Sequence, residues 1–489
     1  MTKNSPAFPS TSTPPKKQIN LLRGWPNTSL LPTQVIQNAA NKVLGNPDLA
    51  NPGLLYGPDP GPSSLRESVA TWLRRFYSEY YTSSSSRNED EEIPLSRDNQ
   101  GTEISSEADR ICITGGASQN LACILQTYTD PKVTRVWMVT PGYFLAGRIF
   151  DDSGLRVAAA GEGDEGVDLD ELERKMEEAE VEDTGVKPIK DSKSRPWGKI
   201  YKNIIYCVPT FSNPSGKTMS LSCRTELVKL ARKYDALIIT DDVYDFLQWS
   251  TTSSNPDIPL KKALLPRLVD IDRTLKPIPD PNSFGNAVSN GSFSKITGPG
   301  VRTGWAEATP KFALGLSLVG SSRSGGCASQ LTATIIDQVL RSGDLTKHIE
   351  GVLQPAYQIR YKRIMGAIER ELGPLGVSVE NTGTDVGGLK VFGGYFIWLN
   401  LPNSVDGELV AQIALEEENL VVAKGSIFEV QGDESVKLPR GLRLCFSWVE
   451  VDDLEEGVVR LGRAVKKVLD GGGRSSADGR GERSLAEFK

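Results

Sequence analysis

The stretch SFSKITGPGVRTGW, residues 292–305, contains the most informative residue of the chain, Lys295. The residues beside this lysine are small and uncharged, unlike the mixed charges of a solvated face. Arg302 follows seven positions later, and Ser292 precedes the lysine by three. A guanidinium and a hydroxyl are groups that bind phosphate. The stretch therefore predicts a reactive lysine beside a phosphate site.

A carboxylate earlier in the chain completes this pattern. Asp241 follows the apolar run 236–240, which predicts a buried strand. A carboxylate at a strand end can pair with a ring nitrogen and keep it protonated. A Schiff-base lysine, a phosphate site and an acidic partner for a pyridinium are what pyridoxal 5′-phosphate requires. We expect Asp241 and Lys295 to bind this cofactor, with Asp242 as the competing carboxylate and a helix-capping or surface aspartate as the structural alternative.

Further candidates for the cofactor follow other predicted strands. The turn Gly115–Ser118 leads into a helix, whose first N–H groups can hold a phosphate. Tyr143 can stack on the ring, and Tyr244 and Asn213 can bind its oxygen. Each has a common alternative, as a turn or as ordinary packing. Because ligands of open α/β sheets bind at the carboxyl ends of strands, the convergence favours a shared site.

Two cationic residues place demands on their surroundings: Arg443 needs an anionic partner, and Lys295 needs a lowered pKa. Arg443 lies in GLRLCF, residues 441–446, where a charge within an alternating apolar strand is costly unless it is paired. A substrate α-carboxylate would pair with it in bidentate fashion, and a buried salt bridge is the alternative. Lys295 must have a lowered pKa to be a free amine, and we expect burial and Arg302 to lower it.

The order of the predicted elements indicates an α/β fold. Strands alternate with helices in the first half, which is typical of a parallel sheet covered by helices. We therefore expect a large cofactor-binding domain with a mostly parallel sheet wound with helices, plus a smaller α+β C-terminal domain. The predicted strands are 111–114, 133–140, 201–208, 236–240, 394–399 and 442–448, and the predicted helices are 64–81, 169–179, 221–234, 331–340, 355–372 and 454–469.

Composition shifts divide the chain into five predicted parts. Both ends are rich in small polar residues or in Gly and Pro, and are expected to be disordered. The parts are a disordered segment 1–17, an N-terminal arm 18–50 that contributes to the small domain and the active site, the large domain 51–345, the small domain 346–470 and a disordered tail 471–489. The large domain carries polar or irregular insertions at about 83–109, 184–198 and 251–290.

Composition also excludes several functions. The 489 residues include 56 Lys+Arg and 62 Asp+Glu, so the chain lacks the cationic excess of a nucleic-acid-binding protein. A single histidine, His348, excludes a His-rich metal site, and we expect no metal. The six cysteines form no C-x-x-C pair and mostly lie in apolar runs, which indicates buried free thiols and a reducing compartment. With no long apolar run and no secretory signal, we expect no membrane association and a cytoplasmic rather than mitochondrial location.

The stretch 292–305, with Pro-Gly between Lys295 and Arg302, resembles the pyridoxal-phosphate enzymes of fold type I, classes I and II. Within them it is most similar to the branch of 2-aminoadipate, kynurenine and aromatic aminotransferases. The resemblance covers about residues 20 to 470. It implies that Lys295 forms the Schiff base and moves a proton, with Asp241 as the pyridinium partner. It also implies ring contacts by Tyr143, Asn213 and Tyr244, and phosphate contacts by Gly116, Ala117, Ser118, Ser292 and Arg302.

The same resemblance implies a substrate site and an assembly. Arg443 would bind the α-carboxylate of the substrate, helped by Asn213 and the backbone near Gly24. Tyr56 would reach the phosphate in a partner subunit, which implies a homodimer with shared sites. The implied reaction moves an amino group from 2-aminoadipate, an aromatic or a branched-chain amino acid to a 2-oxo acid such as 2-oxoglutarate, by a ping-pong mechanism. A lyase or synthase on the same fold and a non-catalytic binding protein are the alternatives.

Overall fold

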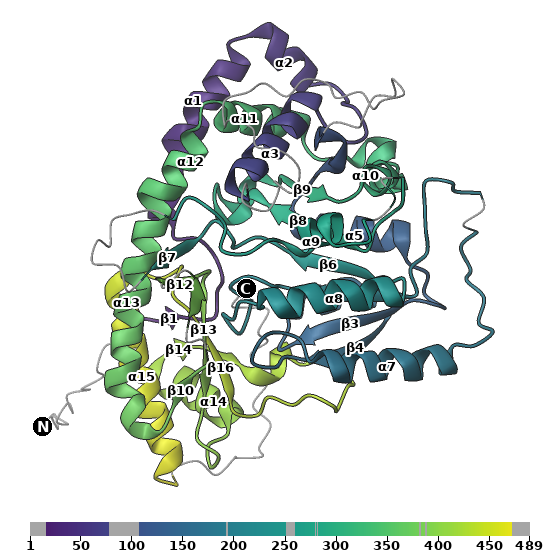
Figure 1. Cartoon of the computed structure of the whole chain (residues 1–489). Coiled ribbons are helices and arrows are strands. Elements are labelled where there is room, and N and C mark those ends of the chain that lie inside the picture. The colour runs from purple at the N-terminus through teal and green to yellow at the C-terminus, as the bar shows by residue number, and fades with distance from the viewer. Residues whose placement is uncertain are drawn as a thin grey trace, which may run out of the picture.

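The structure is a computed structural model that describes residues 16–77, 107–191, 194–250, 260–278, 280, 282–380, 383–386 and 389–471. It contains a large body of sheet and helices, with a smaller body beside it formed mostly by the C-terminal part of the chain (Figure 1). The predicted segments 1–17, 83–109 and 471–489 lie almost wholly outside the described residues. Among the helices that are described, none is long and apolar enough to cross a membrane.

The large body is built on a seven-stranded sheet. Its order is β2 (Ile111–Thr114), β9 (Gly304–Glu307), β8 (Ala287–Ser292), β6 (Leu237–Asp241), β5 (Asn203–Cys207), β3 (Arg135–Thr140) and β4 (Arg156–Gly161). Strands β8, β6, β5, β3 and β4 are parallel to their neighbours in this series, and β9 is antiparallel to β8 and β2. The mostly parallel sheet expected from the sequence is confirmed.

Helices cover both faces of this sheet. Side chains alternate between the faces along a strand, so Ile204 and Tyr206 of β5 pack on one face while Ile205 and Cys207 pack on the other. The first face is covered by α5 (Ala117–Tyr128), α6 (Phe144–Asp152) and α10 (Pro310–Ser317). The second is covered by α7 (Leu169–Glu182), α8 (Leu221–Lys233) and α9 (Leu268–Thr274). Burial on both sides explains why these strands read as continuous apolar runs.

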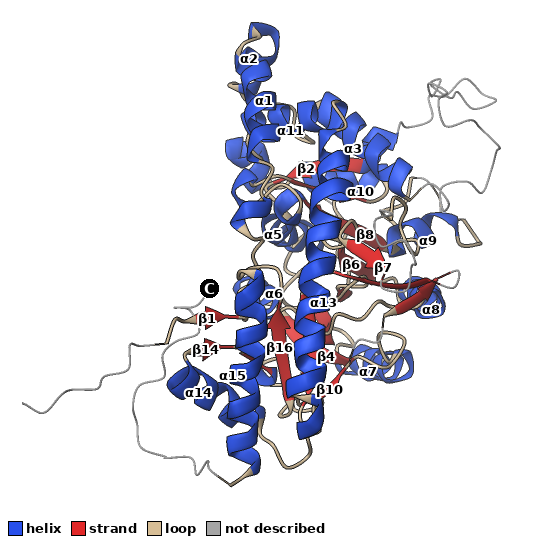
Figure 2. Ribbon diagram, turned by 90° about the vertical axis from the view of Figure 1, so that its left-hand side faces the viewer, coloured by secondary structure: helices blue, strands red, loops and turns tan. Residues whose placement is uncertain are grey.

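A group of helices lies at one end of the large body and leads into the small one. This group contains α1 (Thr33–Leu44), α2 (Pro47–Gly53), α3 (Ser63–Phe76), α11 (Gln330–Arg341) and α12 (Asp344–His348). Helix α1 packs on α11. The long helix α13 (Gln354–Glu371) then runs along the side of the molecule from the large body to the small one (Figures 1 and 2).

The small domain is an antiparallel sheet with helices on it. The sheet order is β10 (Ser378–Val379), β13 (Phe396–Asn400), β16 (Gly441–Cys445) and β15 (Ala423–Lys424). Helices α14 (Gly407–Glu418) and α15 (Val451–Leu469) pack on each other, and α13 packs on α15. The N-terminal strand β1 (Ile19–Asn20) pairs in parallel with β14 (Leu420–Val421), which places the start of the N-terminal arm on the small domain, while α1 and α2 of the same arm pack on α11 of the large body.

A separate three-stranded sheet joins the two bodies. It is formed by β11 (Thr384–Val386), β12 (Leu389–Gly393) and β7 (Gln248–Ser250) in antiparallel pairing. Short 3-10 turns occur at Thr28–Leu30, Glu107–Arg110, Phe293–Lys295, Pro299–Val301, Gly373–Leu375 and Gly425–Phe428, and π-helical turns at Ser322–Gly326 and Ile349–Leu353. Several of these turns flank the candidate site described below.

Two local predictions are wrong. The segment 251–290 is not one irregular insertion, because α9 and the start of β8 lie within it. The strand predicted from Gly394 begins only at Phe396. Gly394 has a φ of +70°, and a Cβ there would lie 2.9 Å from the side chain of Phe211, so this position is a tight turn that favours glycine.

Candidate active site

A cavity lies where the carboxyl ends of the sheet strands meet the N-terminal arm and the small domain. The predicted site residues that line it are Gly24, Ala117, Ser118, Tyr143, Asn213, Asp241, Tyr244, Ser292, Lys295, Arg302 and Arg443. Gly116 lies against Arg302 at the cavity wall. Tyr56 is not among the lining residues. The structure therefore brings together all but one of the residues chosen from the sequence.

Lys295 is the last residue of the 3-10 turn that follows β8. Its Nζ donates to the carbonyl of Gly24 at 2.9 Å, and it lies 5.8 Å and 5.3 Å from the ring centroids of Tyr244 and Tyr395. Burial lowers the pKa of Lys295 to about 8, while Cys445 and Asp241 act in the opposite direction. Arg443, rather than the expected Arg302, is the cation that lowers it further.

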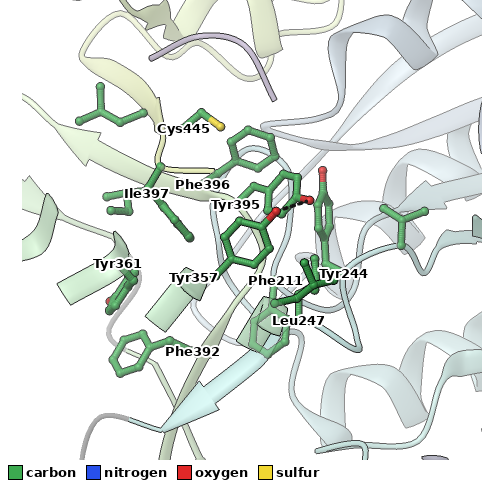
Figure 3. Close-up of a cluster of buried hydrophobic side chains, with 14 of the residues drawn as sticks. Phe211, Tyr244, Leu247, Tyr357, Tyr361, Phe392, Tyr395, Phe396, Ile397 and Cys445 are labelled. Atoms are coloured by element: carbon green, nitrogen blue, oxygen red, sulfur yellow. Dashed lines mark hydrogen bonds between the residues drawn. The ribbon is translucent and has the colours of Figure 1, made fainter. Parts of the chain in front are cut away.

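Tyr244, Tyr357 and Tyr395 belong to a cluster of buried aromatic side chains (Figure 3), and two of them contact the turn of this lysine. The hydroxyl of Tyr357, from α13, lies 3.1 Å from that of Tyr395, and Tyr395 donates to the carbonyl oxygen of Lys295 at 3.1 Å. Tyr395 stands just before β13, so these contacts come from the small domain and its connecting helix. The position of the lysine turn is therefore tied to both domains.

Asp241 ends β6 and faces the cavity. Tyr206 donates to its Oδ2 at 3.2 Å, and Oδ1 is buried without a hydrogen-bond partner in the described part of the chain. Burial raises the pKa of Asp241 to about 6, partly offset by Tyr206 and Lys295. Successive strand residues point to opposite faces, and Asp242 accepts hydrogen bonds from Thr240 and Ser289 on the other side. Only Asp241 of the two competing carboxylates lines the cavity.

The turn between β2 and α5 forms an anion cradle with Arg302. Gly116 has a φ of +98° and caps α5 without a side-chain hydrogen bond. A Cβ on it would lie 3.0 Å from Nη2 of Arg302, which donates to the carbonyl of Gly115 at 2.8 Å. Ser118 and Ser292 add hydroxyls to the lining. The first turn of a helix and a guanidinium together suit a phosphate.

Arg443 is a buried cation that has no acidic partner in the described part of the chain. It is 2% exposed, and no carboxylate forms an ion pair with it among the residues that the structure describes. Its Nη1 donates to Oδ1 of Asn213 at 2.7 Å, and its Nη2 donates to the carbonyl of Leu22. Burial lowers the pKa of Arg443 to about 10. The described residues thus give no support to the salt-bridge alternative, and the guanidinium suits an anionic ligand.

These residues fit pyridoxal 5′-phosphate. The unpaired oxygen of Asp241 suits a protonated ring nitrogen, the buried amine of Lys295 suits a carbonyl, and the Gly116 cradle suits the phosphate. Because Asn213 accepts from Arg443 through its oxygen, its amide nitrogen is left to donate toward a ring oxygen. Tyr143 follows β3 and lines the same cavity, where a ring can stack.

Sequence reasoning missed several lining residues, among them Tyr206, Asn290 and Arg23. The sequence placed Tyr206 only within an apolar strand. Because that strand neighbours the one that ends at Asp241, the tyrosine hydroxyl could have been predicted to donate to the carboxylate. Asn290 donates to the carbonyl of Ala117 at 3.0 Å and accepts from Asn120, which links β8 to the start of α5. Arg23 is the one charge in the stretch INLLRGWP, residues 19–26, and this isolation was its only signal.

Tyr56 lies outside the cavity of its own chain. It follows α2 and is 86% exposed. A Cβ on Gly325 would lie 3.0 Å from its ring. The predicted contact of Tyr56 with a second copy of the chain stays a prediction.

Comparison with known proteins gives a consistent result. A family model described as aminotransferase class I and II matches residues 17–461. YER152C, an uncharacterised protein of Saccharomyces cerevisiae, is 34% identical over 92% of this chain and 97% of its own length. Aromatic-amino-acid aminotransferase 1 of Thermococcus litoralis is 27% identical over 92% of this chain and 88% of its own. The kynurenine aminotransferase of Pyrococcus horikoshii, solved with PMP, superposes with a TM-score of 0.68 at 26% identity, covering 92% and 91% of the two chains.

Proposed function

The chain belongs to the class I and II aminotransferase family, and we propose that it moves the amino group of 2-aminoadipate, an aromatic or a branched-chain amino acid to a 2-oxo acid such as 2-oxoglutarate. Its reaction is transamination, and its cofactor is pyridoxal 5′-phosphate. The observation that carries the proposal is the meeting of Lys295, Asp241 and Arg443 in one cavity. When bound, the cofactor supplies a carbonyl that condenses with amines and a protonated ring that accepts electron density.

Lys295 is the proposed base. With a pKa of about 8, about a tenth of its amine is neutral at pH 7 and able to take a proton. Its Nζ would remove the proton from the α-carbon of the substrate and later return one. Arg443 would hold the substrate α-carboxylate so that the α-hydrogen faces Lys295, with Asn213 and the backbone at Gly24 beside it.

The other residues would orient and tune the cofactor. Asp241 keeps the ring nitrogen protonated, and Tyr143 stacks on the ring. Tyr244 and Asn213 bind the ring oxygen. The phosphate is held by Gly116, Ala117, Ser118, Ser292 and Arg302. Arg302 is held in place by its hydrogen bonds to the carbonyls of Gly115 and Pro299.

The proposed active form is a homodimer. An exposed tyrosine next to two exposed leucines, Leu54 and Leu55, is a typical interface anchor. We assign Tyr56 to the phosphate of the partner subunit. The proposed compartment is the cytoplasm, which suits six cysteines that are all free.

An absorbance spectrum tests the proposed function. The purified protein should show a band of the lysine-bound cofactor that shifts when an amino acid is added and returns with 2-oxoglutarate. Lys295→Ala should show neither the band nor turnover. Release of pyruvate and ammonia without an acceptor would instead indicate the lyase alternative. A band that no substrate shifts, together with no exchange of the substrate α-proton for solvent deuterium, would indicate a binding protein.

A further inference from the structure

The proposed phosphate site is assembled from two segments that lie far apart in the chain. Gly116, Ala117 and Ser118 stand at the start of α5, whereas Ser292 ends β8 and Arg302 follows it. The strand that leads into α5 is β2, and β9 lies between β2 and β8 in the sheet. Because neighbouring strands are about 4.8 Å apart, the sheet alone leaves the two segments about 10 Å apart at their base. Contacts between α5 and β8 must therefore set the width of the phosphate site.

Two buried asparagines make such a contact. Asn290 of β8 is 1% exposed, and Asn120, in the first turn of α5, is fully buried. Nδ2 of Asn290 donates to the carbonyl oxygen of Ala117 at 3.0 Å, and Nδ2 of Asn120 donates to Oδ1 of Asn290 at 2.8 Å. Asn290 thus binds the first turn of the helix at two points.

The backbone fixes the direction of these two hydrogen bonds. A carbonyl oxygen can only accept, so the amide nitrogen of Asn290 must face Ala117 and its amide oxygen must face Asn120. Asn120 must then present its own amide nitrogen. Each side chain therefore has one favourable orientation, and the pair holds the helix at a defined distance from the strand.

Asn290 also lies beside the other functional parts of the cavity. It is opposite Asp241 in the register of β6 and β8, and its carbonyl oxygen accepts from the N–H of Asp242 at 3.1 Å. Ser292 lies two residues further along the same side of the strand, and Lys295 ends the turn that follows. The asparagine pair thus joins the start of α5 to the strands that carry the acid and the lysine.

A second link between the two segments is more open to water. Nη2 of Arg302 donates to the carbonyl of Gly115 at 2.8 Å, but the arginine is exposed. Water can replace a partner lost at an exposed position, whereas a buried amide that loses its partner stays unpaired. The asparagine pair is therefore the link whose loss should cost more.

We propose that Asn120 and Asn290 are positioning residues that hold the start of α5 on β8 and thereby set the affinity of the site for the phosphate group. The inference rests on the phosphate site of the proposed function. The N–H groups of a helix N-terminus bind an anion only when they point at it, so a shift of α5 away from β8 weakens binding. Among the described residues, Asn290 lines the cavity and Asn120 does not. An effect of Asn120 on the phosphate must therefore act through its neighbours.

A purely structural role in the core is the alternative. The pair stands among buried apolar residues, with Leu121 and Ile124 of α5 and Val288 of β8 in one cluster. If the pair served only the fold, its loss would lower the free energy of unfolding and would affect ligands with and without a phosphate alike.

The test uses two cofactor analogues, 4-deoxypyridoxine 5′-phosphate and 4-deoxypyridoxine. Both carry a methyl group in place of the aldehyde, so neither reacts with Lys295, and they differ only in the phosphate. Calorimetry on the cofactor-free protein measures both dissociation constants. We expect Asn120→Leu to lower the preference for the phosphorylated analogue about 5- to 20-fold, because a buried amide oxygen loses its partner. The affinity for the other analogue should change less than about threefold.

A double-mutant cycle tests whether the two asparagines act together. Asn290→Leu removes both hydrogen bonds and should lower the preference further than Asn120→Leu does. In the Asn290→Leu background, Asn120→Leu should add little, because its partner is already gone. The double variant leaves neither amide of the pair unpaired, so it should fold even where a single variant is unstable.

Asn203→Leu is the matched control. Asn203 is 4% exposed, and its Oδ1 accepts from the indole N–H of Trp137 at 2.9 Å. It stands at the start of β5, at the end of the sheet opposite the cavity. This substitution should lower the free energy of unfolding and leave the preference for the phosphorylated analogue unchanged.

These affinities are measured without turnover, which separates this inference from the proposed reaction. Equal loss for the two analogues, an unchanged preference in the double variant, or additive effects of the two substitutions would overturn the positioning role. A protein that shows the expected losses but transaminates no amino acid would support the role and overturn the proposed reaction alone. A wild-type protein that binds both analogues equally would overturn the phosphate site and the positioning role together.

Discussion

At the scale of residues, two groups of opposite charge, Lys295 and Asp241, line the same buried cavity and shift each other's pKa. Burial lowers the pKa of Lys295, and the charge of Asp241 partly restores it. The same burial raises the pKa of Asp241 to about 6, and Lys295 lowers it. Each group therefore favours the ionised form of the other, and changing one must shift the titration of its neighbour.

This coupling predicts a pH dependence for cofactor uptake. The neutral amine of Lys295 reacts with the cofactor carbonyl, so the rate of uptake by the cofactor-free protein should rise with pH and level off above about 8. Asp241→Asn removes the charge that raises the pKa of Lys295, and should move the midpoint to lower pH. Stopped-flow absorbance at a series of pH values measures both midpoints.

The neighbouring carboxylate provides the control for this experiment. Asp242 points away from the cavity and is not among the groups that shift the pKa of Lys295. Asp242→Asn should therefore leave the midpoint where it is. Equal shifts in the two variants would show that the effect comes from the fold and not from the Asp241 charge.

The identity of these residues could be predicted from the sequence, but their surroundings could not. Lys295 and Asp241 stand out by their neighbours in the chain. The cation that acts on Lys295 is Arg443, which lies 148 positions away, and not Arg302, which lies seven positions away. Nearness in sequence suggested the wrong cation because Arg302 turns toward the carbonyls of Gly115 and Pro299.

At the scale of elements, the turn between β2 and α5 makes a specific prediction. Gly116→Val places a side chain at a φ of +98°, where L residues are strained, and 3.0 Å from Arg302. The cofactor-free turn should relax to relieve strain of about 1–3 kcal/mol, and because binding must restore the strained turn, the dissociation constant of the cofactor should rise about 5- to 150-fold. Equilibrium titration of the cofactor-free protein by absorbance measures it.

A substitution at a second glycine, far from the phosphate turn, serves as the control for the loss of cofactor affinity. Gly366 lies within α13, and a Cβ added to it would have no neighbouring atom within 4 Å in the described part of the chain. Gly366→Ala should leave cofactor affinity unchanged and raise the free energy of unfolding by up to about 1 kcal/mol. Unchanged affinity in Gly116→Val would contradict the assignment of this turn to the phosphate.

Elements with strong periodicity could be predicted, and those set by distant contacts could not. Strand β2 and helix α8 follow their patterns closely, because a buried strand and an amphipathic helix repeat at fixed intervals. Helix α9 was missed because only seven residues form it among prolines. Arg267 and Asp270 stabilise its start by a buried ion pair of 2.9 Å, a contact that a hydropathy pattern does not contain.

At the scale of the whole molecule, the cavity exists only because the two ends of the chain meet. Leu22 accepts from Arg443 across 421 positions, and β1 pairs with β14 across about 400. Local patterns predict neither contact, which explains why Arg23 was overlooked. Tyr357 of α13 contacts Tyr395 (Figure 3), and Tyr395 donates to the carbonyl oxygen of Lys295, so α13 and the small domain are likewise joined to the lysine turn.

The proposed dimer predicts that two defective subunits can restore one complete site. Lys295→Ala removes the lysine, and Tyr56→Ala removes the residue proposed to act on the partner's phosphate. In a mixed dimer, the site of the Tyr56→Ala subunit keeps its own lysine and receives an intact tyrosine from the other subunit. Co-expression with two affinity tags yields this mixed dimer. At limiting cofactor its activity should approach half that of the wild type.

The same mixture separates a shared site from a self-contained one. If Tyr56 acted within its own chain, neither site of the mixed dimer would be complete, and its activity would not exceed that of the Tyr56→Ala protein. The side chain is 86% exposed and outside the cavity of its own chain, which favours the shared arrangement. A dimer by sedimentation that shows no restored activity would therefore overturn the role of Tyr56 while leaving the assembly intact.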